Sequence, residues 1–185
     1  MIKKIAAFLL IMSFCSTLLL SEGGITLSYK SDVVEYSENN YEMTSSQIGI
    51  GVNLWPDDFG IGFAFGFYVP YDIHRQDNQI DLKALSLDTM LTIGTEVDLG
   101  IISIYTGFGL HADGQVSATS ETVYGIGKGG LGMNVYCMLP WLHIGITGGF
   151  YYDMFGFEVS NIEGVNDTSK IDGSTGFMIG VTYIF

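Results

Sequence analysis

Large apolar side chains alternate with smaller or polar ones along most of the chain, which is the pattern of β-strands with one apolar face. The pattern is clearest in the last segment, Phe177–Phe185. One face of this segment carries Phe177, Ile179, Val181, Tyr183 and Phe185. At the edge of a soluble sheet such a strand would favour aggregation. In a closed barrel within lipid, both of its edges are paired and its apolar face contacts hydrocarbon.

The same alternation predicts eight strands. They are expected at Ile25–Val34, Gln47–Leu54, Ile61–Val69, Ala84–Ile93, Ile102–His111, Tyr124–Leu139, Leu142–Asp153 and Phe177–Phe185. The connections between them alternate in length. The short ones are Trp55–Asp58, Thr95–Asp98 and Leu139–Trp141, and the long ones are Glu35–Ser45, Pro70–Asp81, Ala112–Thr122 and Glu158–Gly173. A bulge or register change is expected within Tyr124–Gly129, where glycines interrupt the pattern.

Strand length and loop asymmetry together indicate a transmembrane barrel. Strands of about ten residues cross a bilayer when tilted, and such barrels have tight periplasmic turns and longer outer loops. An even number of strands places both chain ends on the periplasmic side. The aromatic girdles are expected at Trp55 and Trp141 on the short-turn side, and at Tyr68, Tyr71, Tyr152 and Phe155 on the long-loop side.

Composition agrees with this fold. Charged residues make up 15% of the chain and hydrophobic residues 48%, whereas an ordinary soluble domain is about 25% charged. The 25 glycines suit strands better than helices, in which each costs roughly 1 kcal/mol relative to alanine.

The last strand closely resembles the C-terminal signature of bacterial outer-membrane β-barrels, with a final Phe185, Tyr183 two residues before it, and apolar residues at the preceding alternate positions. The resemblance implies a small barrel of the OmpX, OmpA-barrel or OmpW type in the outer membrane of a diderm bacterium. It also implies that the outer-membrane assembly machinery recognises Phe177, Ile179, Val181, Tyr183 and Phe185. The rest of the chain matches this family only in architecture.

The N-terminus has the features of an export signal. Lys3 and Lys4 precede an apolar core, Ile5–Leu20, and small or polar residues follow. We therefore expect a cleavable signal peptide at residues 1–21 and the barrel domain at 22–185; a retained membrane anchor is the alternative. Removing the signal leaves five of the seven basic residues against 20 acidic ones, so no basic surface is available for nucleic acid.

Two other folds compete with the membrane barrel. A helical membrane protein needs runs of about 20 apolar residues, and the best mature candidate, Val135–Tyr152, is interrupted by Pro140, His143 and several glycines. A soluble lipocalin-like barrel would carry many Lys and Glu residues on its second face. Here that face is mainly Gly, Ser, Thr, Asn and Tyr, which suits a crowded interior.

The inward face of the barrel is predicted to hold polar and charged side chains: Lys30, Asp32, Gln47, Asn53, Asp88, Lys128, Asn134 and Asp153. Opposite charges in this setting should pair, because unpaired buried charges are costly. The favoured interpretation is a plug of salt bridges. The alternative is a narrow path or pocket, which the many inward glycines would allow unless Tyr105, Tyr136 and Tyr151 fill the space.

Enzymatic and metal-binding features are weak. Of the three histidines, His111 with Asp113 is the only pair that suggests acid–base chemistry, and chance placement explains it better. No metal-ligand spacing recurs. We therefore expect no enzymatic activity, no cofactor and no metal site, and we interpret the acidic loop residues as solvated.

Two functions of different classes remain open. The first is a structural or surface-interaction protein whose long acidic loops contact host or envelope surface ligands. The second is a narrow channel or transporter for small solutes, including apolar ones, which OmpW-like relatives suggest by analogy of fold.

Overall fold

The computed structural model describes residues 21–36, 42–75, 78–79, 84–118, 123–160 and 167–185. Within these ranges the chain forms nine strands and one short 3₁₀ helix. The elements are β1 (Ser21–Tyr36), β2 (Glu42–Pro56), β3 (Phe59–Arg75), β4 (Asn78–Gln79), β5 (Leu85–Asp98), β6 (Ser103–Ala118), β7 (Val123–Leu139), η1 (Pro140–Leu142), β8 (Ile144–Ser160) and β9 (Asp167–Ile184). Among the described residues, no helix is long and apolar enough to cross a membrane.

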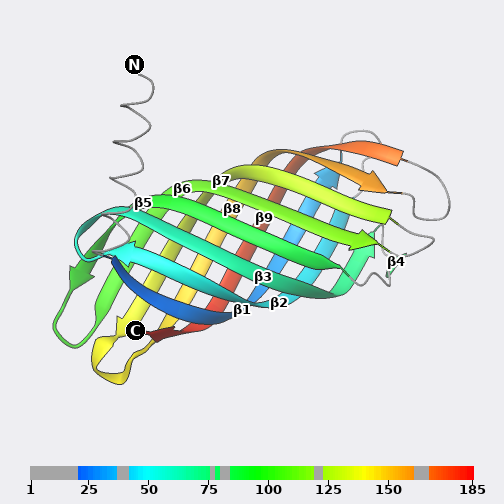
Figure 1. Cartoon of the computed structure of the whole chain (residues 1–185). Helices are drawn as coiled ribbons and strands as arrows, with labels where there is room; N and C mark the ends of the chain where they lie inside the picture. The colour runs from blue at the N-terminus through cyan, green and yellow to red at the C-terminus, as the bar shows by residue number, and fades with distance from the viewer. Residues whose placement is uncertain (1–20, 37–41, 76–77, 80–83, 119–122, 161–166) are drawn as a thin grey trace, which may run out of the picture.

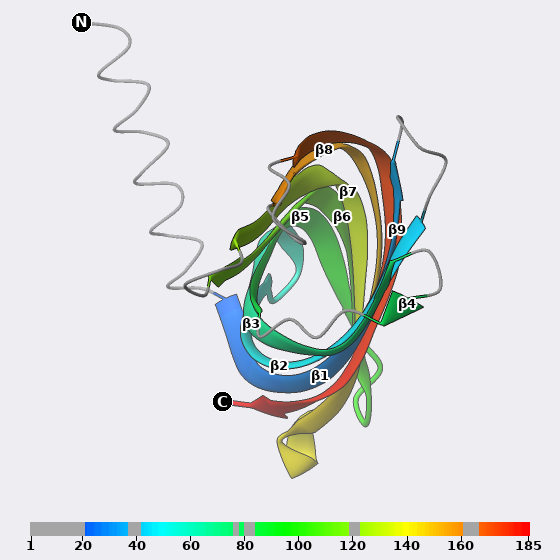
Figure 2. The same cartoon turned by 90° about the vertical axis from the view of Figure 1, so that its right-hand side faces the viewer.

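Eight long strands form one antiparallel sheet that closes on itself. The strand order is β2-β1-β9-β8-β7-β6-β5-β3, and the additional pairing of β2 with β3 completes the ring. β4 is a two-residue strand paired with the end of β3. Figures 1 and 2 show the resulting barrel from the side and from one end. The prediction of an all-β, eight-stranded antiparallel barrel is therefore confirmed, while the predicted signal peptide lies outside the described residues apart from Ser21.

The strands are steeply tilted around the barrel axis. A path of directly paired residues starts at Thr26, passes through Gly51, Gly66, Asp88, Asp113, Lys128, Gly156 and Ile171, and returns to β1 at Tyr36. One turn around the barrel therefore moves ten residues along β1. For eight strands this stagger corresponds to a tilt of about 40°, which agrees with the steep strands in Figure 1.

Alternate side chains face outward, as the sequence predicts. Phe67 on β3 is strongly exposed, and Phe63 and Phe65 are partly exposed on the same face. The apolar face of β9 is exposed throughout: Phe177, Ile179, Val181, Tyr183 and Phe185. A large apolar surface of this kind is stable in contact with lipid rather than water.

The inward side chains form three layers. At the short-turn end, Trp55, Tyr105, Tyr136, Met138 and Ile184 pack together, with the Trp55 and Tyr136 rings stacked at 5.0 Å. The middle layer is polar and charged. At the opposite end, a second apolar cluster consists of Val34, Tyr36, Met43, Ile73, Tyr124, Ile126 and Ile171. The barrel interior is thus filled by side chains along its whole length.

The predicted long loops are wrong in extent, because the strands continue well beyond the expected ends. β6 runs through most of Ala112–Thr122, and β8 and β9 occupy much of Glu158–Gly173. In these extensions, polar inward side chains no longer alternate regularly with apolar outward ones. The alternation in the sequence therefore weakens, although the strands stay paired. The acidic side chains expected in loops are divided accordingly. Glu35, Glu42, Asp72, Glu158, Asp167 and Asp172 lie in strands, whereas Glu38, Asp77, Asp81 and Glu163 lie outside the described residues.

Two of the three predicted short turns are also shifted, whereas the turn between β2 and β3 lies within Trp55–Asp58 as expected. β5 continues through Thr95–Asp98, and the turn comes after it, where Gly100 adopts a positive φ of 84°. After β7, the chain forms η1 and reverses at His143, whose φ is 55°. Both reversals place left-handed backbone beyond the expected turn residues.

Two residues that were predicted for the outward-facing aromatic girdles, Trp55 and Tyr68, point into the barrel instead. Trp55 is 0% exposed because it shares the inward parity of Asn53, and its ring packs inside the barrel. Tyr68 likewise points inward and is buried. The other proposed girdle residues are exposed: Trp141, Tyr71, Tyr152 and Phe155.

Irregular pairing occurs at three places, all toward the end away from the short turns. The extra residues are Asp172 in β9, Tyr71 in β3 and Met154 in β8. Met154 lies opposite Gly129 and Gly130 of β7. An irregularity was expected within Tyr124–Gly129, and it occurs at the end of that segment, but the extra residue is in β8 rather than in β7. Bulges bend a strand and re-aim its side chains.

Candidate functional site: the charged interior of the barrel

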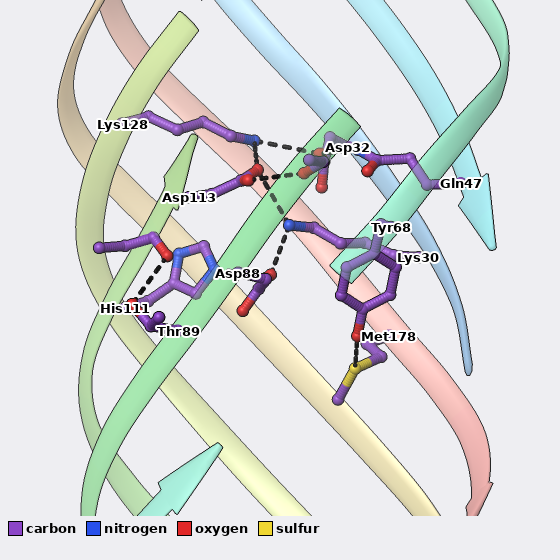
Figure 3. A network of polar contacts seen from close by, with 12 residues as sticks. Lys30, Asp32, Gln47, Tyr68, Asp88, Thr89, His111, Asp113, Lys128 and Met178 are labelled. Carbon is purple, nitrogen blue, oxygen red and sulfur yellow. Dashed lines mark hydrogen bonds and ion pairs between the residues drawn. The ribbon is translucent and has the colours of Figure 1, made fainter. Parts of the chain in front are cut away.

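A network of ion pairs crosses the middle of the barrel. Lys30 on β1 contacts Asp88 on β5, and its Nζ atom lies 2.9 Å from Oδ2 of Asp113 on β6. Lys128 on β7 lies on the other side of Asp113, with its Nζ atom 3.3 Å from the same oxygen. Asp113 therefore bridges the two lysines, as Figure 3 shows.

The network extends to the neighbouring strands. Nζ of Lys128 lies 3.2 Å from Oδ2 of Asp32 and 3.7 Å from Oδ2 of Asp153. The Gln47 amide donates a hydrogen bond of 2.9 Å to Asp32, and Lys128 donates one of 3.0 Å to Ser174. These contacts join β1, β2, β7, β8 and β9 through side chains as well as through the backbone ladder.

His111 is the third potential cation of this network. Its Nδ1 atom lies 2.6 Å from Asp153 Oδ1, and its Nε2 atom lies 3.2 Å from Asp88 Oδ2. Its ring also stacks on Tyr151, with centroids 4.1 Å apart. The sequence singled out His111 and Asp113 as a possible pair but favoured chance placement, and in the structure Asp113 contacts the two lysines instead.

Aromatic rings enclose the lysines. Nζ of Lys30 lies 5.0 Å from the Tyr151 ring centroid and 5.4 Å from that of Tyr68. Nζ of Lys128 lies 5.6 Å from the centroid of Tyr151. Contacts of an ammonium group with ring faces are favourable where water is excluded. The rings therefore help to accommodate the buried cations.

Negative charge exceeds positive charge in this cluster. Four carboxylates, those of Asp32, Asp88, Asp113 and Asp153, face two ammonium groups and one imidazole. Even a protonated imidazole leaves one negative charge in excess. Among the described residues, no three His, Cys, Asp or Glu side chains are arranged to hold a metal ion.

The residues predicted for the lumen all face inward, but they do not form a single group. Lys30, Asp32, Gln47, Asp88, Lys128 and Asp153 belong to the ionic network. Asn53 instead donates a hydrogen bond to Thr26, which bonds Thr182 at 2.7 Å. Asn134 donates one of 3.3 Å to the Tyr136 hydroxyl.

Asp113 and His111 are the network members that sequence reasoning missed. Asp113 was placed in the polar loop Ala112–Thr122, and His111, at the end of the predicted strand, was not included among the lumen residues. The signal that would have found both was parity, since Asp113 follows His111 by two residues and β6 continues to Ala118. Cross-strand pairing places Asp113 directly between Asp88 and Lys128.

A small cavity lies beside the ionic network, among the residues that the structure describes. It has a volume of about 20 Å³ and lies among residues that include Thr26, Asn53, Tyr68, Asp88 and Met178. This volume corresponds to room for about one water molecule. At some inward glycines a larger side chain occupies the space: a Cβ atom added to Gly66 would lie 2.7 Å from the Tyr68 ring.

Several solved structures of outer-membrane β-barrels are similar to this chain. Neisserial surface protein A is 12% identical with a TM-score of 0.53, and the match covers 88% of this chain and 97% of that protein. Ail, the attachment invasion locus protein of Yersinia pestis, is 16% identical with a TM-score of 0.44, over 89% of this chain and 99% of Ail. The outer-membrane protease OmpT of Escherichia coli is 8% identical with a TM-score of 0.37, over 89% and 96% of the two chains.

No protein-family model and no curated protein matches the sequence. The structural similarity shows the fold, which is that of small outer-membrane β-barrels.

Loss of one cation should strongly destabilise the barrel. In Lys30→Met, the Asp88 and Asp113 carboxylates lose their shared ammonium group within the barrel interior. Breaking a buried pair in this way typically costs 3–5 kcal/mol, and we expect a loss of about that size in the free energy of unfolding, measured by urea titration of the protein in lipid vesicles.

The matched control for this experiment is Lys170→Met, since Lys170 is exposed on β9. Its effect should stay within about 0.5 kcal/mol. Adding Asp88→Asn and Asp113→Asn to Lys30→Met should restore part of the loss. Equal effects of Lys30→Met and Lys170→Met would contradict a stabilising network.

Proposed function

We propose that this protein is an integral outer-membrane β-barrel with a closed lumen, and that it serves a structural or surface-interaction role rather than transport. The observation that carries this proposal is the ionic network that crosses the barrel, next to which the described residues line a cavity of about 20 Å³. A solute path through this layer would require Lys30 and Lys128 to leave their carboxylate partners.

The energetics of the network favour a permanently closed interior. Removing a buried charge from its partner costs several kcal/mol, and Lys30 and Lys128 each contact more than one carboxylate. Apolar clusters lie at both ends of the charged layer. A channel would need all three layers to rearrange together, so the interior is better suited to stabilising the barrel.

The outer end of the barrel is the proposed working surface. Glu35 on β1, Glu42 on β2 and Asp172 on β9 are exposed there, beyond the apolar belt. The whole chain has a formal net charge of −13. Electrostatic complementarity favours partners with a cationic surface, which can be host molecules or other envelope components.

The same geometry argues for a non-enzymatic role. A general base must reach the proton that it removes, but the His111 side chain is 0% exposed and both of its nitrogens already contact carboxylates. The contacts of His111 with Asp88 and Asp153 therefore stabilise the barrel from within, whereas the partly exposed His74 contacts Asp72 at 2.9 Å on β3, away from this network.

The C-terminal strand is proposed to be recognised by the outer-membrane assembly machinery. Phe177, Ile179, Val181, Tyr183 and Phe185 all point outward and are exposed in the folded barrel. The Phe185 backbone N–H donates a hydrogen bond of 3.0 Å to Gly23, which places the two ends of the barrel domain side by side. We assign this end to the periplasm because its connections have two to four residues, whereas those between the long strands at the opposite end have four to nine.

Single-channel recording tests whether the lumen is closed. Purified protein in planar bilayers should give no discrete current steps, because the ionic network and the Trp55 cluster block the path. A general porin incorporated by the same procedure serves as the positive control.

Stepwise currents from the wild-type protein would instead support the alternative, a narrow channel for small solutes, including apolar ones. Their origin in this lumen would be established if Tyr105→Ala enlarged them, since Tyr105 lies in the layer nearest the short turns.

Labelling of intact cells tests the orientation. In a Cys137→Ala background, Glu42→Cys should react with a membrane-impermeant maleimide on intact cells, because Glu42 lies at the outer end of β2. Asp57→Cys, at the short turn between β2 and β3, should react only after the outer membrane is permeabilised. Reversed labelling would refute the proposed orientation.

Truncation of the terminal aromatic tests the assembly signal. Phe185→Ala should lower the amount of assembled protein in the outer membrane several-fold, because recognition depends on this side chain. Phe67→Ala is the matched control, since it removes another exposed outward ring. The two variants should unfold at similar urea concentrations after refolding in vesicles; equal amounts in the outer membrane would contradict the proposed signal.

A further inference from the structure

The apolar exterior of the barrel is much shorter on one wall than on the other. On the wall formed by β9, β1 and β2, the outward series changes from apolar to polar after Phe177, Tyr29 and Ile48. The next outward residues are Thr175 on β9, Ser31 on β1 and Ser46 on β2. Above them, the outward side chains are Val33 and Glu35 on β1 and Thr44 and Glu42 on β2, so Val33 is the one apolar side chain above the change on the described residues of these two strands.

The wall formed by β6, β7 and β8 shows no such change within its described residues. The outward positions of β7 are apolar or glycine along the whole strand: Leu139, Cys137, Val135, Met133, Leu131, Gly129, Gly127, Gly125 and Val123. On β8, Phe155, Phe157 and Val159 continue the apolar series above Tyr152, and on β6 Val116 does the same above Leu110. Val116, Phe157 and Val159 are exposed by 62%, 59% and 44%.

The two walls adjoin where β9 pairs with β8, and their other strands face each other across the barrel. The strand order places β2 opposite β7 and β1 opposite β6. Each of these strands has one end at the short turns. The length of its run of outward apolar residues therefore measures how far the apolar surface extends from that end of the barrel. Figure 1 shows β7 and β8 extending toward the outer end as far as the other long strands do.

A simple estimate gives the difference in height. Each outward position advances two residues, or about 5 Å along the axis for strands tilted by about 40°. The apolar series of β2, from Leu54 to Ile48, therefore spans about 15 Å, and that of β9, from Phe185 to Phe177, about 20 Å. The series of apolar residues and glycines on β7, from Leu139 to Val123, spans about 40 Å. The apolar band of a transmembrane barrel is about 25 Å tall, so one wall is too short for it and the opposite wall is too tall.

We propose that the upper part of the β6–β8 wall is a lipid-docking surface, on which the acyl tails of the outer leaflet pack well above the level that they reach on β1 and β2. The barrel then sits tilted, with β6–β8 immersed more deeply in the outer leaflet. This inference rests on the proposed function, because it requires that the barrel spans a bilayer. Tilting is an ordinary response to hydrophobic mismatch.

The upper part of the β6–β8 wall is continuous with the lipid-facing belt, which indicates that lipid covers it. The upper surface joins the lipid-facing belt below it without a polar break, and it carries no charged outward side chain among the described residues of β7 and β8. A protein-binding surface is normally surrounded by a polar rim. The aromatic residues here are Phe155 and Phe157, whose rings have no polar group to place at a water boundary.

Spin labels measure directly which wall lies in lipid. In the Cys137→Ala background, the label is attached at Val116→Cys or Val159→Cys on the tall wall, and at Thr44→Cys on the short wall. The protein is reconstituted in phosphatidylcholine vesicles, and collisions with oxygen, which concentrates in lipid, are compared with collisions with a water-soluble nickel chelate. We expect the ratio of oxygen to nickel accessibility to be several-fold higher at positions 116 and 159 than at position 44.

Other results would overturn the inference. Nickel accessibility at positions 116 and 159 equal to that at 44 would show that the upper wall is in water. Poor access of both reagents, with dipolar broadening between labels, would show that a second copy of the chain covers it. A label at Ile50→Cys, in the middle of the belt, separates the two proposals: it must be in lipid if the barrel spans the bilayer, whatever the result at positions 116 and 159.

Discussion

Closure of the sheet is the constraint on which the rest of this structure depends. Within a bilayer, backbone groups must find partners inside the protein, and a barrel achieves this because each strand is paired on both sides. Once the ring is closed with a stagger of ten residues on β1, each residue has a fixed side of the wall. Every second side chain must then be compatible with lipid, and the others must fit into a narrow interior.

The narrow interior explains why bulky aromatic residues and glycines occur together on the inward face. A Cβ atom at Gly62 would lie 2.8 Å from Oγ1 of Thr92, whose hydroxyl bonds the Tyr105 hydroxyl at 2.9 Å. Glycine at one position therefore makes room for tyrosine at another. The inward glycines reflect dense packing around large side chains, which the sequence alone left open as a possible path.

The fold, and the assignment of most side chains to the outward or inward face of the barrel, could be predicted from the sequence. Period-two alternation depends only on local backbone geometry. The same rule also assigned Lys30, Asp88 and Lys128 to the interior. The extent of the strands was harder to predict, since Asp113 and Glu158 are acidic residues in glycine-containing segments that resemble loops. Trp55 was misplaced for a related reason: proximity to Pro56 was given more weight than the parity of β2.

The pairing within the interior could not be predicted, because it depends on stagger. His111 and Asp113 are neighbours on one strand face, yet His111 contacts Asp88 and Asp153, whereas Asp113 contacts Lys30 and Lys128. These partners are determined by the ten-residue stagger of the barrel and by the bulge at Met154. Neither can be predicted from the local alternation of apolar and polar residues. The excess of one carboxylate likewise becomes visible only when the whole cluster is assembled.

The ion pairs have a consequence for how the barrel forms. Lys30 and Asp88 come from strands that are not neighbours, and so do Lys128 and Asp32, so these charges meet only after the two ends of the sheet have joined. A half-inserted sheet would present bare ammonium and carboxylate groups to the hydrocarbon. Partly closed forms are therefore strongly disfavoured, and the chain should pass between unfolded and inserted states in a single cooperative transition.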